Sequence, residues 1–517
     1  MPVGCAVQGS LCYEMSERTA IVRLSQRDIS YYSSVDQIYT PGFDLNIAVF
    51  KELGYTQDAL TTILSYMDAG FFNLFVDVYY DRRNSQWQLC PLPFPDGYVS
   101  PNLTYNLTGS ALKTVCEPEV TFGELLSTIN EYIGLSNTNV AAHLLRLSLR
   151  LRELPLPLSK NATGYSNAPG DSSLNQTLTA NLGRMVFSPL DLENSRNTNE
   201  VTDQSVFGRN RTERWPSLDV ILLNLHRRIM VAAIVDTFNG STSAVDLDPN
   251  YVFLNKSFRY EYLYQYDEIP NEFTSGQNYV AQSELSFASA AISGFNPNLE
   301  YASATELAFS PVLNFTTNGS TLVNLYEDYT WGWAAGQPSI QTELDRKDMM
   351  KLNEILCCAL QTTSGWIVGN CLEQYTVLCR HRDNPFDWTP SDSGHTYFDA
   401  DCPQDYFFDA PRTALEARAA RNSLMSHGID AAWVDVNSLS LPNCWVTGGV
   451  RAACPYNIIQ SSRNGVALIV VTATISVCLL TAMIYLEWER MRFPLISNPS
   501  GKRRRQQQSA APDGVPT

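Results

Sequence analysis

Apolar and polar positions in the first half of the chain follow a pattern that predicts strands. The segment NLFVDVYYD (residues 73–81) is a short, mainly apolar run that follows Gly70. The segment AAHLLRLSLRL (residues 141–151) alternates apolar and polar positions in its second half, as a half-buried strand does. A further strand is expected in RMVFSPLDL (residues 184–192), where it ends at a proline.

A longer segment places a helix before another strand. WPSLDVILLNLHRR predicts a helix from Trp215 to about Arg227, and IMVAAIV predicts a strand from Ile229 to Val235. Strands that alternate with helices favour a parallel sheet covered by helices. The fold class expected for the first half is therefore α/β.

Near the end of the chain, residues 465–486 form a run of 22 residues without a single charge. About 20 apolar residues suffice to cross a bilayer core, so we expect a transmembrane helix here, with a buried core helix as the alternative. Arg490, Arg492 and the run 502–505 follow the segment, whereas Arg463 stands alone before it. Positive charge stays cytoplasmic, which predicts a single-pass type I protein with a cytoplasmic tail.

Glycosylation acceptors and cysteines lie on one side of that segment. Nine Asn-x-Ser/Thr acceptors precede it, and so do 11 of the 12 cysteines. This placement predicts a lumenal or extracellular body with disulfide bonds, against the alternative of reduced cysteines in the cytosol. Spacings such as Cys371/Cys379 and Cys444/Cys454 suit local disulfides, and Cys90 and Cys116 are expected to be disulfide-bonded as well. The acceptors are Asn102, Asn106, Asn161, Asn175, Asn210, Asn239, Asn255, Asn314 and Asn318.

The first 28 residues do not fit this topology, because they contain no apolar core of the kind that a signal peptide has. We expect that the signal peptide is missing here and that residues 1–20 are poorly ordered. The alternative is a tail-anchored protein with a cytosolic body.

Charge and residue spacing exclude several function classes. The formal charge of −17 divides into +3 for the tail from Glu487 and −20 before it, and an acidic body does not bind nucleic acid directly. No Cys-x-x-Cys pair occurs and the five histidines are scattered, so no metal or other cofactor is expected. The partners expected are the lipid bilayer and an unidentified protein or glycan.

The strand at residues 73–81 and the segment from Trp215, in that order, resemble the barrel of phosphatidylinositol-specific phospholipase C-like phosphodiesterases. The resemblance implies a TIM-barrel-like domain with active residues at the C-terminal ends of its strands. It also implies two catalytic histidines near the first strands, but the first histidine in the chain is His143. We interpret His143 as a core residue and expect a barrel without that chemistry.

The second half of the chain resembles a C-type lectin-like domain. WGWAAGQPS (331–339), CCAL (357–360), GWIVGNC (365–371) and LCR (378–380) have the order of its second half. The resemblance implies an α+β fold with tryptophans in its core and a Cys358–Cys371 bond, and it makes Cys357 a candidate partner for Cys379. The family's Ca²⁺ ligands are absent, because Gln337-Pro338-Ser339 and Trp366-Ile367-Val368 stand in their place.

The segments 401–416 and 432–456, followed by the apolar run and a basic tail, closely resemble the fungal maintenance of telomere capping protein 6 family. Members are single-pass type I membrane glycoproteins that begin with a signal peptide, so the resemblance implies a membrane glycoprotein linked indirectly to telomere capping. The expected organisation is a barrel domain (21–290), a C-type lectin-like and cysteine-rich region (291–463), a transmembrane helix (465–486) and a cytoplasmic tail (487–517).

Three function classes follow from these expectations. The leading hypothesis is a non-enzymatic membrane glycoprotein that binds or holds partners in the secretory pathway or at the cell surface. The second is a calcium-independent reader of glycans or glycolipids. The third is a phosphodiesterase whose unrecognised acid and base come from Asp77, Asp81 and Asp191.

Overall fold

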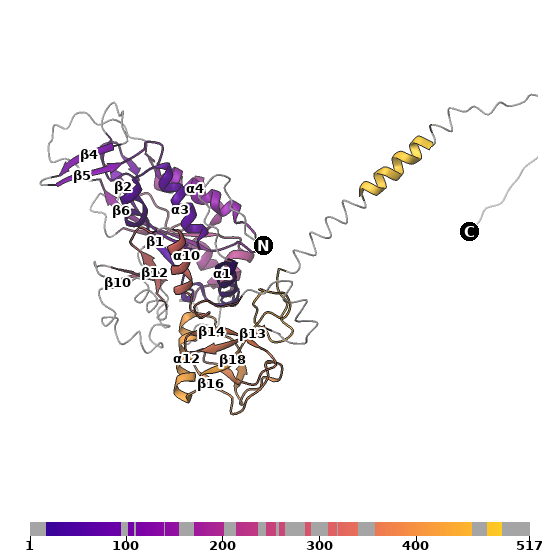
Figure 1. Ribbon diagram of the computed structural model, residues 1–517. Helices are drawn as coiled ribbons and strands as arrows, with labels where there is room; N and C mark the ends of the chain where they lie inside the picture. The colour runs from indigo at the N-terminus through magenta and orange to yellow at the C-terminus, as the bar shows by residue number, and fades with distance from the viewer. Residues whose placement is uncertain are drawn as a thin grey trace, which may run out of the picture. The chain divides into compact units, whose positions relative to one another are not determined.

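In the computed structural model, strands between Gly42 and Leu313 form a ten-stranded sheet in which every pairing except β2–β3 is parallel. Its order is β10-β11-β12-β1-β2-β6-β8-β7, with β3 beside β2 and β9 beside β8. Among the described residues β9 does not pair with β10, so the ring of strands is an incomplete barrel (Figure 1). The strands are β1 (Gly42–Asp44), β2 (Asn73–Asp81), β3 (Gln86–Gln88), β6 (Leu145–Glu153), β7 (Val186–Phe187), β8 (Ile229–Ile234), β9 (Phe253–Leu254), β10 (Phe258–Leu263), β11 (Leu285–Ala290) and β12 (Ser310–Leu313).

The structure describes only part of the chain. It divides the chain into two units, Met1–Cys454 and Pro455–Thr517. The described residues are 17–94, 102–107, 110–138, 140–154, 170–200, 214–235, 245–254, 258–263, 285–290, 305, 309–317, 319–339, 357–456, 473–486 and 488.

Helices cover the outer face of the strands. Leu147 and Leu149 of β6 are buried in one core with apolar residues of α3 and α4, such as Ile63 and Ile129. Each of these helices begins at a threonine, Thr56 or Thr121, whose hydroxyl caps the first turn. The described helices and the remaining hairpin of this half are α1 (Glu17–Ile29), η1 (Val35–Gln37), η2 (Asn46–Phe50), α2 (Lys51–Leu53), α3 (Gln57–Asp68), β4 (Asn102–Leu107), β5 (Ser110–Val115), α4 (Phe122–Leu135), α5 (Leu174–Leu182), η3 (Gly183–Met185), α6 (Pro189–Thr198), η5 (Val220–Asn224) and α10 (Gly319–Asp328).

Strand β6 shows why the barrel has a polar lining. Side chains alternate across a strand, so the leucines of LRLSLRLRE point to the covering helices and the other positions point inward. The inward positions carry Arg146, Ser148, Arg150 and Arg152. Arg146 therefore lies where the strand begins, and Arg150 and Arg152 lie where it ends.

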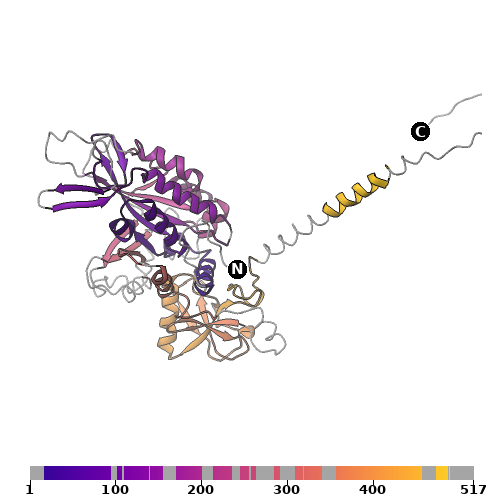
Figure 2. The ribbon, with the colours of Figure 1, turned by 45° about the horizontal axis from the view of Figure 1, so that its top comes forward.

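The helix α1 joins the barrel to the rest of its unit (Figure 2). Its residues Ile21, Val22 and Ile29 are buried in one core with tryptophans of the second region, among them Trp333. The indole N–H of Trp333 donates to the hydroxyl of Ser25 in α1 at 2.9 Å. The helix thus packs as a shared element between the two regions.

The second region contains a six-stranded sheet of order β14-β13-β18-β15-β16, with β17 beside β15. Three disulfide bonds, Cys358–Cys371, Cys379–Cys402 and Cys444–Cys454, lie in it, and Cys90–Cys116 lies in the barrel region. Its elements are β13 (Cys357–Thr362), β14 (Gly365–Asn370), β15 (Thr376–His381), β16 (Trp388–Pro390), η8 (Tyr397–Asp399), β17 (Tyr406–Phe408), α12 (Ala414–His427) and β18 (Ala431–Asn437).

The structure corrects two disulfide expectations. Cys379 bonds Cys402, so Cys357 is not its partner, and Cys371 bonds Cys358 rather than Cys379. Neighbouring residues of a strand point to opposite faces. Cys357 accordingly packs with the tryptophan core, whereas Cys358 packs on the other face with Cys379.

Three expectations about element boundaries also change. The segment 184–192 forms the two-residue strand β7 and then enters α6, because Ser188 caps a helix that has a proline in its first turn. The barrel sheet continues through β12, which pairs with β1 at Phe43 and Leu313, so it extends past residue 290. The helix α1 begins at Glu17, inside the range expected to be poorly ordered.

Of the apolar run 465–486, the structure describes residues 473–486, which are helical. Within the described part of the chain no helix has both the length and the apolar character needed to cross a membrane. The remainder of the run lies outside the described residues.

Candidate functional site

The polar residues of the barrel converge where its strands end. Asp44 is the last residue of β1, Asp77 lies in the middle of β2, and Arg150 lies opposite Asp77 in the register of β2 with β6. Barrels of this class place their functional residues at the C-terminal ends of the strands. We therefore take this cluster, with Arg152, as the candidate functional site and name it the barrel-mouth network.

Ion pairs connect every charge in the barrel-mouth network. The guanidinium of Arg150 donates to both carboxylate oxygens of Asp44, at 2.7 Å each. Its Nε donates to Oδ1 of Asp77 at 2.5 Å, and the Nε of Arg152 lies 2.7 Å from Oδ2 of Asp77. Two carboxylates thus face two guanidinium groups, and the charges of the network cancel.

Neutral groups complete the network. The amide oxygen of Asn46 accepts the backbone N–H of Asp77 at 2.7 Å, and its amide nitrogen donates to the hydroxyl of Tyr55. The hydroxyl of Tyr79 donates to Oδ2 of Asp77 at 3.3 Å. Burial raises the pKa of Tyr55 and of Tyr79 well above that of a free phenol, so both stay protonated at neutral pH.

Arginine contacts all four carboxylate oxygens of the network. A general base needs a lone pair that can reach a substrate proton, and each of these oxygens already faces a guanidinium group. Asp44 and Asp77 are also buried. Among the described residues, no group of three or more His, Cys, Asp or Glu is arranged to hold a metal ion.

The other two aspartates considered as catalytic residues do not join Asp77. Asp81, at the end of β2, accepts hydrogen bonds from the backbone N–H of Arg83 and the amide of Asn84, and so shapes the turn that leads to β3. Asp191 closes a capping box at the start of α6 and pairs with Arg227 at 3.0 Å. Both carboxylates therefore have local structural roles.

His143 lies at the opposite end of the barrel, just before β6. Its ring stacks on Phe72, with ring centres 4.5 Å apart. Burial, and then the positive charges of Arg23, Arg27 and Arg228, lower the pKa of His143 well below its usual range. The lowered pKa agrees with a neutral imidazole, but the side chain of His143 is half-buried and does not belong to the buried core.

The tryptophans of the second region are structural. Trp331, Trp333 and Trp366 are buried, and Trp366 packs edge-on against the other two at 5.4 and 5.7 Å. Gln337, at the position of the lectin family's calcium loop, uses its side-chain oxygen to accept the N–H of Val368 at 3.3 Å.

The disulfide expected from the lectin-like resemblance is present. The Cα atoms of Cys358 and Cys371 are 5.2 Å apart, within the range that a disulfide requires. Cys444 and Cys454 close the second expected loop, in which Gly448 and Gly449 adopt positive φ angles.

Four of the nine glycosylation acceptors lie within described elements or beside them. Asn102 is exposed on β4, which also contains Asn106, Asn175 lies in the first turn of α5, and Asn314 follows β12. The others lie outside the described residues: Asn161, Asn210, Asn239, Asn255 and Asn318.

The sequence did not single out Asp44, Arg150 and Arg152. One signal for them exists in LRLSLRLRE, because arginine recurs on the face of the strand opposite the leucines. That pattern is unusual for a strand buried on both faces and requires acidic partners inside the barrel.

Fold and site together define an incomplete parallel α/β barrel whose mouth is closed by ion pairs. The family model described as the MTC6 partial TIM-barrel domain matches residues 13–335, and the chain belongs to this family.

Relatives named Maintenance of telomere capping protein 6 match over nearly the whole chain. The protein of Meyerozyma guilliermondii is 27% identical over 90% of this chain and 88% of its own length. That of Komagataella phaffii is 25% identical over 95% of this chain and 94% of its own length, and that of Yarrowia lipolytica is 23% identical over 95% and 90%.

Proposed function

We propose that this chain is a non-enzymatic, single-pass type I membrane glycoprotein whose folded body binds or holds a protein or glycan partner. The observation that carries this proposal is the barrel-mouth network. Asp44, Asp77 and Arg150 occupy the place where a barrel enzyme keeps its acid and base, and they neutralise each other there. A barrel with such a mouth serves as a scaffold.

The proposed topology rests on the sequence. Nine glycosylation acceptors and 11 cysteines precede residues 465–486, and the basic run 502–505 follows them. The four disulfides of the described structure suit an oxidising compartment. In this proposal residues 465–486 span the membrane, and the body faces the lumen or the cell exterior.

The link to telomeres comes from the names of the relatives, and we propose that it is indirect. An acidic body on the lumenal side of a membrane is separated from the chromosome and repels its phosphates. The chain would influence telomere capping through a partner that its body or its tail holds.

We further propose that the second region is a C-type lectin-like fold without calcium-dependent sugar binding. The Cys358–Cys371 bond and the buried tryptophan core support this assignment. Because Trp331, Trp333 and Trp366 are buried, they are not available to stack on a sugar ring. Glycan-array binding by the purified chain would favour the glycan-reading alternative instead.

Complementation in Komagataella phaffii tests the non-enzymatic role. The strain would lack the gene for its own protein of this family and would also have a second defect that weakens telomere capping. Growth of the strain would then report whether the introduced chain is functional. We expect rescue by the full chain and also by the quadruple variant Asp44→Asn, Asp77→Asn, Arg150→Met, Arg152→Met, because replacing a whole ion-pair network by groups of similar size is often neutral for stability. A chain that ends before residue 465 should fail. Failure of the quadruple variant at normal abundance would contradict the proposal.

A further inference from the structure

A cluster of charged side chains lies where the second region meets α1. Asp409 accepts the Nε–H of Arg380 in β15 at 2.8 Å and a guanidinium N–H of Arg412 at 3.2 Å. Arg412 also contacts the end of α1, because its backbone carbonyl accepts the hydroxyl of Ser30 at 2.7 Å. One residue therefore belongs both to the charge cluster and to the contact with the helix that the two regions share.

Glu416 is the most deeply placed carboxyl group of this cluster that titrates near neutral pH. Its side chain is 3% exposed, and its Oε2 accepts the backbone N–H of Arg412 at 3.0 Å. Burial raises the pKa of Glu416 to about 7, so the carboxyl gains and loses its proton around neutrality. In the structure the guanidinium of Arg412 forms its ion pair with Asp409.

The guanidinium of Arg412 also has a donor that is not used. Its Nε–H is buried and has no hydrogen-bond partner among the residues that the structure describes. A buried donor without an acceptor is costly, so an acceptor that reaches it is favoured. Glu416 is close enough to act electrostatically on this guanidinium, and its ionised carboxylate would be a charge-assisted acceptor for the unused donor.

Asp409 does not depend on Arg412 for its hydrogen bonds. Its Oδ2 accepts from Arg380, and its Oδ1 accepts the backbone N–H of Ala410 at 2.9 Å as well as the guanidinium of Arg412. If Arg412 turns away, each oxygen of Asp409 therefore keeps a donor. The ion pair with Arg412 is the contact that this cluster loses most easily.

The state of Glu416 decides the balance of charge at this site. In the described structure the charged groups that act on the cluster from other elements are Arg380 of β15 and Asp435 of β18, and the strands β13 and β16, which pack on α12, carry no charged side chain. With Glu416 neutral, Arg380 and Arg412 face Asp409 and Asp435. With Glu416 ionised, the same two guanidinium groups face three carboxylates.

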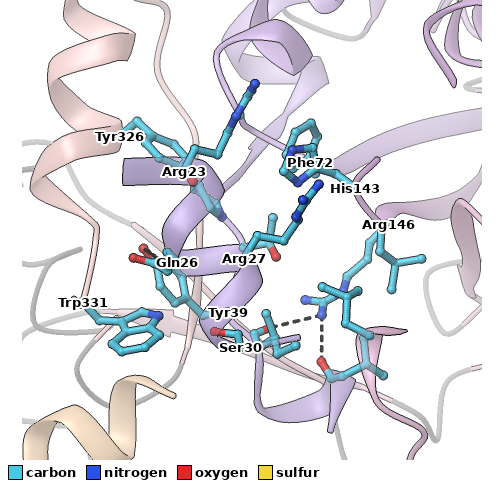
Figure 3. A pocket seen from close by; sticks show the side chains of 17 residues that line it. Arg23, Gln26, Arg27, Ser30, Tyr39, Phe72, His143, Arg146, Tyr326 and Trp331 are labelled. Carbon is cyan, nitrogen blue, oxygen red and sulfur yellow. Dashed lines mark hydrogen bonds between the residues drawn. The ribbon is translucent and has the colours of Figure 1, made fainter. Parts of the chain in front are cut away.

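We propose that Arg412 is a pH-dependent link between the second region and α1. It pairs with Asp409 while Glu416 is protonated and changes to Glu416 once that carboxyl is ionised. The exchange draws Arg412 toward α12 and weakens the hydrogen bond between its carbonyl and Ser30. Ser30 and one face of α1 line a cavity of about 60 Å³ (Figure 3), so this end of the helix has room to shift.

Hydrogen–deuterium exchange of the purified full chain at pH 6 and pH 8, with exchange times corrected for the intrinsic rate, tests this link. The peptide over residues 26–38 reports on the end of α1, where the backbone N–H of Ser30 donates to Gln26. One pH unit above a pKa of about 7 favours the ionised form about tenfold, so protection of this peptide should fall by up to about tenfold at pH 8. Peptides of α4 should keep their protection at both pH values.

Two substitutions separate the exchange of partners from a general loss of stability. Glu416→Gln keeps an acceptor for the backbone N–H of Arg412 but does not ionise, so residues 26–38 should be equally protected at both pH values. Arg412→Met leaves Glu416 able to ionise but removes the guanidinium, so this peptide should again not respond to pH. Glu124→Gln, at an exposed position in the first turn of α4, is the matched control and should respond like the unsubstituted chain.

Equal protection of residues 26–38 at pH 6 and pH 8 in the unsubstituted chain would overturn the proposal. A pH response that persists in Glu416→Gln or in Arg412→Met would overturn it as well. If Glu416→Gln does not fold, Arg412→Met carries the test, since the side chain of Arg412 is 25% exposed.

Discussion

Arg150 binds both carboxylate oxygens of Asp44 although the two residues lie on strands that are not neighbours. Strand β2 separates β1 from β6, and its Asp77 lies within reach of the same guanidinium. One arginine thereby connects three strands at the barrel mouth. Breaking a buried pair on one side leaves an uncompensated charge, which is costly.

Asp77→Ala should lower the free energy of unfolding by about 2–3 kcal/mol, because Arg150 loses one of its two carboxylate partners and Arg152, which is partly exposed, loses its carboxylate. Chemical denaturation of the purified chain measures this change. The matched control is Asp191→Ala, which removes one half of the capping box of α6 and the pair with Arg227 and should cost about 1 kcal/mol. Equal losses for the two variants would show that the network has no special structural role.

The disulfide between Cys358 and Cys371 should be needed for folding. The bond closes a loop with a sequence separation of 13, which is worth on the order of 3 kcal/mol by the chain-entropy argument. Cys358→Ala should therefore reduce export of the protein from the endoplasmic reticulum, as measured by the maturation of its glycans. Cys478→Ala, in the helical segment 473–486, is the control and should mature normally. Normal maturation of Cys358→Ala would contradict this expectation.

Glu416 should make the stability of the second region depend on pH. Its side chain is buried in the first turn of α12, and this burial raises its pKa from 4.5 to about 7. The hydrogen bond from the backbone N–H of Arg412 and the positive charges of Arg380 and Arg412 lower the pKa, but by less than burial raises it. Between these two values the native state keeps a proton that the unfolded chain has lost. The stabilisation that protonated Glu416 contributes is therefore complete below about pH 4.5 and is lost as the pH rises through 7. This loss lowers the free energy of unfolding by on the order of 3 kcal/mol.

Denaturation at pH 5 and pH 8 tests this dependence against two variants. Glu416→Gln keeps the acceptor for Arg412 but does not ionise, so its stability should change less between the two pH values than that of the unsubstituted chain. Glu124→Gln, in the first turn of α4 and exposed, should behave like the unsubstituted chain. An unchanged pH dependence in Glu416→Gln would show that other groups cause it.

Glycosylation of Asn102 tests the topology. Asn102 is an exposed acceptor on β4, so a lumenal body should carry a glycan there. With a functional signal peptide added, the chain should gain mobility on endoglycosidase treatment, and Asn102→Gln should remove part of that shift. Asn84→Gln, which lies outside any acceptor sequence, is the control. A chain whose mobility does not respond to the enzyme would contradict the lumenal placement.

The strands of the barrel could be predicted where their pattern was strong. The segment 73–81 forms β2 over the same residues, and the alternation after residue 144 forms β6. The prediction of a strand over residues 184–192 was wrong in its length, because only Val186 and Phe187, before Pro189, pair in the sheet. A proline that ends a strand can also begin a helix, and Ser188 decides between the two by capping.

The candidate site could be predicted only in part. Asp77 was considered from its place in an apolar strand, but its partners Asp44 and Arg150 are separated from it by 33 and 73 positions. They meet because β1, β2 and β6 are adjacent, and the order of strands in a sheet is a tertiary property that local patterns do not contain. The Cys379–Cys402 bond depends in the same way on the pairing of β15 with β17.

Turnover of phosphodiester substrates tests the central claim most directly. The purified full chain would be incubated with phosphatidylinositol and with glycerophosphodiesters, and the release of phosphorylated product compared with that of Asp77→Ala and of an empty-vector preparation. Because the oxygens of Asp44 and Asp77 are engaged by Arg150 and Arg152, we predict that all three preparations release the same background amount. Release by the unsubstituted chain above the empty-vector level, lost in Asp77→Ala while Asp191→Ala retains it, would show that the barrel is an enzyme.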